Sequence, residues 1–95
     1  MDYFKTRDLP TAALQLASDG IEFHGIEGSN PRNLYFLFTP RKKAEELALS
    51  FLAGKAKVNA RLYADSFRRA KDIIFETERR QTTSTGLVSY ANSSR

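Results

Sequence analysis

The chain has 95 residues, of which 41% are hydrophobic, and it carries a formal net charge of +4 and no cysteine. This length fits a single domain, and the lack of cysteine excludes disulfide bridges and thiolate metal sites. The amino terminus lacks the apolar stretch of a signal peptide, and no apolar run approaches the roughly 20 residues of a membrane span, so we expect a cytoplasmic protein with no membrane partner.

The charge is spread unevenly along the chain. Residues 1–40 hold three bases and five acids, whereas residues 41–80 hold eleven bases and six acids. The positive field therefore belongs to the second half. A basic surface of this kind favours an anionic partner such as nucleic acid, although it says nothing about the fold.

The first 20 residues predict a short strand followed by a helix. Residues 3–6 form the strand, and Asp8 is a good N-cap with Pro10 in the first helical turn, where its missing N–H costs nothing. Apolar residues recur at helical spacing over residues 9–17. Gly20 then ends the helix, since glycine takes a left-handed conformation without strain.

Two strands joined by a turn follow. Residues 21–27 alternate apolar and polar side chains, as a half-buried strand does. Residues 28–32 are dense in turn-forming residues, and residues 33–39 form a strand whose centre, Leu34–Phe38, is apolar on both faces. Such a strand is usually central in its sheet, or it presents one aromatic face to a partner. The whole segment predicts a β-hairpin.

Two helices complete the domain. We expect Thr39 to cap the first, with Pro40 at its first helical position and Gly54 at its end. Asn59 is expected to cap the last and longest helix. The apolar stripe of this last helix consists of Tyr63, Phe67, Ala70 and Ile74.

The composition changes after the last helix. Serine, threonine, asparagine and glycine dominate the end of the chain, and such a segment cannot repay the entropy of ordering. We therefore predict one domain over residues 1–78 and a flexible tail over residues 79–95. The element order β-α-β-β-α-α predicts an α+β fold, a small, mostly antiparallel sheet with helices packed on one face.

Few residues offer catalytic chemistry. The single histidine, His24, lies on a predicted strand, where a lone histidine is more often structural than a general base. Asp65 and Asp72 are interleaved with Arg68 and Arg69 at i, i+4 spacing, which indicates a solvated helix face rather than a metal site or an acid–base pair. No phosphate-loop motif is present. We expect no enzyme activity and no cofactor or metal.

Two groups of bases are candidates for phosphate contact. Arg41, Lys42 and Lys43 fall in the first turn of a predicted helix, where cations oppose the helix dipole and free backbone N–H groups are able to bind phosphate. The second group lies around the start of the last helix and comprises Lys55, Lys57 and Arg61. Clustered bases indicate an electrostatic footprint for nucleic acid, but both groups are also explained as solvated, solubilising charge.

One aromatic residue is a candidate for base stacking. Tyr35 points away from Phe36 on its strand and shares a face with Leu37. If that face is open, Tyr35 is placed to stack on a nucleic-acid base, as sheet aromatics do in single-strand binders. The alternative is that both faces of the strand are buried and Tyr35 belongs to the core.

Two sequence motifs resemble a known family. The first is Phe4-Lys5-Thr6 with Asp8-Leu9, and the second is Gly54-Lys55-Ala56-Lys57-Val58-Asn59. The chain resembles, over about residues 3–75, a short domain-of-unknown-function family found in bacterial, archaeal and phage genomes. That family has no assigned activity, so the resemblance implies a compact domain encoded by a phage or mobile element and assigns no functional residue.

Two hypotheses for function remain. The first is a small accessory protein that binds DNA or RNA, with phosphate contacts from both basic groups and stacking by Tyr35. The alternative is a protein-interaction module, a phage or host modulator that docks on a protein partner through its apolar strand or forms a homodimer, with no nucleic-acid binding.

Overall fold

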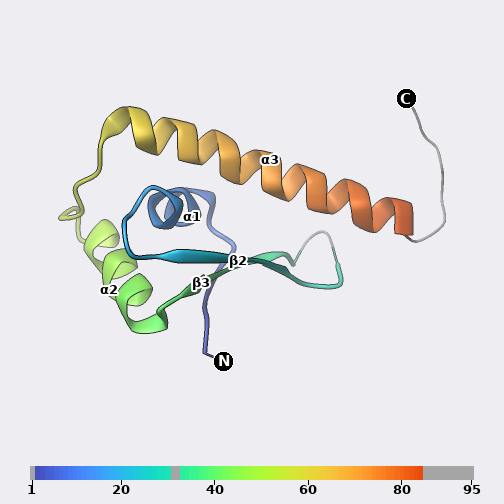
Figure 1. Ribbon diagram of the computed structural model, residues 1–95, viewed down its shortest axis with the longest axis horizontal. Coiled ribbons are helices and arrows are strands. Elements are labelled where there is room, and N and C mark those ends of the chain that lie inside the picture. The colour runs from blue at the N-terminus through green and yellow to red at the C-terminus, as the bar shows by residue number, and fades with distance from the viewer. Residues whose placement is uncertain (1, 31–32, 85–95) are drawn as a thin grey trace.

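The computed structural model describes residues 2–30 and 33–84. The element order is the predicted β-α-β-β-α-α (Figure 1). The elements are β1 (Phe4–Thr6), α1 (Leu9–Leu16), β2 (Glu22–Glu27), β3 (Tyr35–Thr39), α2 (Arg41–Leu52) and α3 (Ala60–Ser84).

The three strands form one antiparallel sheet with the order β1-β3-β2. Strand β3 is central, as its apolar sequence predicts. Phe38 lies opposite Phe4 of β1 and opposite Phe23 of β2. The register between β2 and β3 shifts between Phe23 and Gly25, which places a β-bulge at His24.

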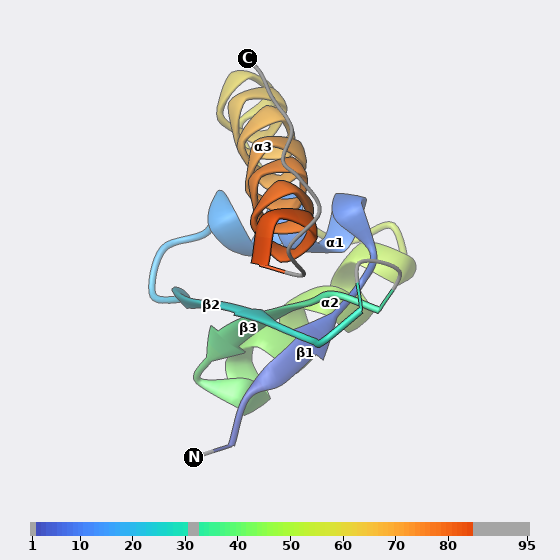
Figure 2. The ribbon, with the colours of Figure 1, turned by 90° about the vertical axis from the view of Figure 1, so that its right-hand side faces the viewer.

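The core lies between one face of this sheet and the helices. Phe36 and Phe38 are completely buried there, and they cluster with Ala12 of α1, Ala44 of α2 and Ala70 of α3. Helices α1 and α3 lie over the same side of the sheet, whereas α2 follows β3 at one end (Figures 1 and 2). The small alanine side chains let the helix backbones approach the aromatic rings closely. The predicted α+β fold is confirmed.

Local capping signals explain where three elements begin or end. The Asp8 carboxylate accepts a hydrogen bond from the backbone N–H of Thr11 at 3.0 Å, so Asp8 is the predicted N-cap of α1. Asn59 Oδ1 accepts from the N–H of Leu62 at 2.9 Å and caps α3. Gly54 follows the last turn of α2 with a φ of 73°, the left-handed conformation that suits glycine.

Two predicted helix boundaries are wrong. Thr39 does not cap α2, because it is the last residue of β3 and its hydroxyl bonds to His24; Pro40 occupies the N-cap position without a side-chain hydrogen bond. Helix α1 ends earlier than expected, with Ala17 as its C-cap, so Gly20 lies in the following turn, at a φ of 80°. Pairing with β2 outweighs the local capping preference of Thr39.

Helix α3 is long relative to the domain that it covers. Its 25 residues continue to Ser84, beyond residue 78 where the sequence places the start of a tail. Residues 85–95 lie outside the described residues, and a tail there stays a prediction. Within the described ranges, no helix combines the length and apolar character needed to cross a bilayer.

Candidate nucleic-acid interface

The side of the sheet opposite the core carries the candidate interface. Because side chains alternate along a strand, Tyr35, Leu37 and Thr39 of β3 point away from the buried Phe36 and Phe38, and all three are half-buried. We call this side the open face. It comprises Tyr3, Lys5, His24, Glu27, Tyr35, Leu37 and Thr39.

One end of the open face presents Tyr35 with a guanidinium beside it. The central carbon of the Arg7 guanidinium lies 5.8 Å from the centroid of the Tyr35 ring, a cation–π contact. Lys5 Nζ lies 2.9 Å from Glu27 Oε1, and this ion pair crosses over β3. The structure therefore places Tyr35 outside the core, on the face that the stacking hypothesis requires.

The other end of the open face holds a second aromatic pair. The rings of Tyr3 and His24 have centroids 5.3 Å apart and are tilted by 53°. His24 Nε2 and Thr39 Oγ1 share a hydrogen bond of 2.6 Å, whose donor is set by the imidazole tautomer. The bulge aims His24 toward Thr39, and Tyr3 precedes Phe4, so both rings meet above the end of β3. His24 thus contacts both Tyr3 and Thr39.

The first turn of α2 borders this Tyr3–His24 end. Arg41 Nε donates a hydrogen bond to Asp2 Oδ2 at 2.7 Å, and Arg41 also lies 3.6 Å from Glu45. Asp2 is the neighbour of Tyr3 in the chain, so this hydrogen bond ties the first turn of α2 to the residue before Tyr3. The charge of Arg41 is already balanced by two exposed carboxylates.

The two lysines after Arg41 differ in their surroundings. Lys42 is exposed and has no ion pair or hydrogen bond within the described part of the chain. The ammonium of Lys43 instead occupies the space where a side chain at position 20 would lie, above Gly20 and next to Ser18 and Asp19. That place is just beyond the carboxyl-terminal end of α1, where a cation is favourable. The place of the Lys43 ammonium over Gly20 is not evident from its position in the sequence.

The second basic group lies elsewhere. Lys55 and Lys57 belong to the loop after α2, and Arg61 opens α3. The 12 residues of α2 separate this group from Lys42 by about 18 Å along the helix axis. Lys42 thus lies in the same turn of α2 as Arg41, at the end that borders the open face, whereas the second group lies at the other end of α2.

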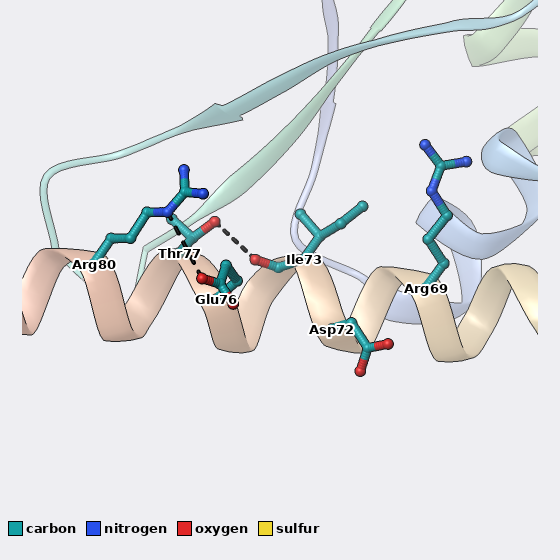
Figure 3. Close-up of a pocket in the computed structure, with 6 residues that line it drawn as sticks. All are labelled: Arg69, Asp72, Ile73, Glu76, Thr77 and Arg80. Carbon is teal, nitrogen blue, oxygen red and sulfur yellow. Dashed lines mark hydrogen bonds and ion pairs between the residues drawn. The ribbon is translucent and has the colours of Figure 1, made fainter. Parts of the chain in front are cut away.

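A shallow groove runs along α3, and its charges are largely balanced (Figure 3). Glu76 accepts hydrogen bonds from Arg79 at 2.7 and 2.5 Å and lies 3.8 Å from Arg80. The hydrogen bond from Arg79 holds the pKa of Glu76 below its usual value, and the same bond raises the pKa of Arg79. Arg69 points from the helix toward the sheet in this view. Paired charges of this kind give little attraction for an anion.

The predicted binding residues fall in several separate places, and none of them belongs to a group of metal ligands in the described ranges. No three His, Asp or Glu side chains in residues 2–30 and 33–84 are grouped so as to hold a metal ion. The predicted binding residues divide into Tyr35, Arg41 and Lys42 around the open face, Lys43 above Gly20, and the separate second group. Sequence reasoning missed Arg7, Tyr3 and the contact of Tyr3 with His24, since each depends on which strands flank β3.

Comparison with known proteins confirms that the chain is a domain of unknown function. A family profile described as Domain of unknown function (DUF5659) matches residues 1–76, which span every element up to the second half of α3. No curated protein and no solved structure shows a significant match. Because the profile covers most of the chain, the protein belongs to the family described as Domain of unknown function (DUF5659).

Proposed function

We propose that this protein binds nucleic acid on the open face of its sheet, as a small accessory protein of a phage or mobile element, without catalysis. The observation that supports this most is the pairing of Tyr35 with Arg7 on a face that no core residue uses. An aromatic ring offers a base a stacking surface, and a guanidinium beside it is placed to contact the adjoining phosphate.

Positive charge supports the same location. Arg7 and Lys42 have no ion pair within the described residues, and Arg41 borders the same face. Phosphate contacts by the two cations without an ion pair, Arg7 and Lys42, on a single strand give a slope of about −1.4 for log affinity against log salt concentration. Affinity should therefore fall about sevenfold between about 50 and 200 mM salt.

The test is fluorescence anisotropy with labelled oligonucleotides at these two salt concentrations. We expect binding in the micromolar range or tighter at low salt. Lys42→Glu should weaken it several-fold and flatten the salt slope, because an exposed cation beside the face becomes an anion. Lys71→Glu is the matched control, because it makes the same charge change at an exposed position of α3, and that helix lies on the core side of the sheet (Figure 1).

The controls separate local contact from overall charge. If Lys71→Glu weakens binding as much as Lys42→Glu does, net charge rather than the open face is responsible, and the site assignment is wrong. No binding of any oligonucleotide at low salt would overturn the proposed function. Arg41 and Lys43 are poor test positions, because each already contacts other parts of the fold.

A second candidate function is homodimerisation through α2. The apolar strand that first suggested protein docking is mostly buried, since Phe36 and Phe38 are in the core. Leu49 and Leu52 are instead 61% and 81% exposed, and they lie three residues apart on one side of α2. Sedimentation analysis of the wild type and of Leu49→Ser/Leu52→Ser tests this. A monomeric wild type at high concentration would exclude it.

A further inference from the structure

The open face carries aromatic rings in two places, which we call stations. The first station is Tyr35 on β3. The second is the Tyr3–His24 pair at the opposite end of β3. Four residues of extended chain separate Tyr35 from Thr39, which places the two stations about 13 Å apart along the strand. Between them, Leu37 continues the half-buried surface.

Only the Tyr35 station has a guanidinium against its ring. Arg7 lies over Tyr35, whereas Arg41 bonds to Asp2, the chain neighbour of Tyr3, and also pairs with Glu45. The two stations therefore share a ring surface for a base, and the Tyr35 station adds a guanidinium for a phosphate. A polyanion with regularly spaced bases matches this pair of ring surfaces, whereas a single small anion uses only the guanidinium.

We infer that the open face takes single-stranded nucleic acid, with one base stacked on Tyr35 and another on the Tyr3–His24 pair. This inference rests on the proposed function and narrows the ligand from nucleic acid in general to single strands. In a duplex, each base is covered by its neighbours and shows only its edges in the grooves. A ring on a protein surface is able to stack only on a base that is unpaired or splayed out.

The charges on the open face also agree with a site that binds its ligand by stacking. The ion pair of Lys5 with Glu27 adds no net charge at the Tyr35 end, and Glu22 lies 3.5 Å from His24. A nearly neutral face attracts a duplex weakly, because non-specific duplex binding depends on many unpaired cations. Ring surface is thus the main source of affinity on this face.

The experiment compares four single variants with the wild type on single-stranded and double-stranded oligonucleotides of the same sequence. Tyr35→Ala and Tyr3→Ala remove one ring each, and each should weaken single-strand binding by about 5- to 100-fold. Tyr35→Phe and Tyr3→Phe keep the ring and should bind within about twofold of the wild type. Circular dichroism melting checks that each variant is folded.

Oligonucleotide length gives a second, independent readout. Affinity of the wild type for single strands should rise with length until both stations are occupied and then level off. In Tyr3→Ala, that rise should stop at a shorter length, since only the Tyr35 station remains. If Tyr3 is only structural, Tyr3→Ala lowers the melting temperature but does not change the oligonucleotide length at which affinity levels off.

The outcomes separate the inference from the proposed function. If neither single nor double strands bind, the proposed function fails and the inference fails with it. If double strands bind as well as single strands and both alanine variants bind like the wild type, the inference is overturned while the proposed function stands. If Tyr35→Ala alone weakens binding, the second station is wrong.

Discussion

The hydroxyl of Tyr63 links the longest helix to the first one, and its removal tests how α3 is held. Tyr63 Oη donates a hydrogen bond to the backbone carbonyl of Pro10 at 3.1 Å. The ring also lies 6.3 Å from Phe51 and 6.2 Å from Phe67, centroid to centroid. In Tyr63→Phe these ring contacts remain and only the hydrogen bond between α3 and α1 is lost.

The expected loss follows from this geometry. A hydrogen bond in a partly buried place contributes about 1 kcal/mol net to the free energy of unfolding. In a domain of this size, a change of about 1 kcal/mol lowers the melting temperature by roughly 4–8 °C. Tyr35→Phe is the matched control, because the Tyr35 hydroxyl has no hydrogen bond within the described residues. That variant should stay within about 0.5 kcal/mol of the wild type.

The same hydroxyl predicts a pH dependence. Burial, and to a smaller degree the Asp8 carboxylate, raises the pKa of Tyr63 above its ordinary value of 10.0. A raised pKa means that the folded state holds the phenolic proton more tightly than the unfolded state does. The resulting stability is fully present below pH 10 and is lost as pH rises through the folded pKa.

Urea unfolding at neutral pH and in a series up to about pH 11 measures both effects. The wild type should be more stable than Tyr63→Phe at pH 7, and this advantage should shrink above pH 10. Equal stability at pH 7 would refute the role of the hydrogen bond to Pro10. An advantage that persists unchanged at high pH would show that the phenol does not ionise as its burial implies.

Substitutions at three further positions test the fold by urea unfolding. Asn59→Ala removes the cap of α3 and should cost about 1 kcal/mol, whereas Asn59→Asp should keep most of the stability. Gly54→Ala should also cost about 1 kcal/mol through its φ of 73° alone, because no atom lies within 4 Å of an added Cβ; an unchanged stability would contradict this. Phe38→Ala should cost about 3–5 kcal/mol, and a loss below 1 kcal/mol would contradict its place in the core.

The sequence predicts those parts of the fold that are determined by residues close together in the chain. Asp8 and Asn59 act within three residues of their own position, so their capping roles are readable without the tertiary structure. Thr39 shows the limit of such reasoning. Its side chain suits an N-cap, but its backbone is opposite Glu22 in the sheet, and the sequence does not state which strands pair.

The candidate site likewise has one part that the sequence predicts and one part that it does not. Alternation along β3 predicts that Tyr35 shares a face with Leu37, and the structure shows that this face is not the core. The contact of Tyr3 with His24 requires that β1 and β2 lie on either side of β3. It also requires that a bulge turns His24 toward Thr39 on the open face. Neither condition leaves a local pattern in the sequence.

Most of the positive charge of the chain lies away from the stacking rings of the open face. The salt dependence of binding therefore distinguishes a ligand on the rings from a ligand on the basic residues. Residues 41–80 hold eleven bases, but only Arg41 and Lys42 lie in the turn of α2 that borders the open face, and Arg41 is already ion-paired. We therefore expect binding on that face to have a salt slope of about −1.4, the value for two phosphate contacts on a single strand, by Arg7 and Lys42. A slope of about −4 or steeper requires six or more contacts. That result would move the ligand away from the stacking rings, to the bases of the loop after α2 and of α3.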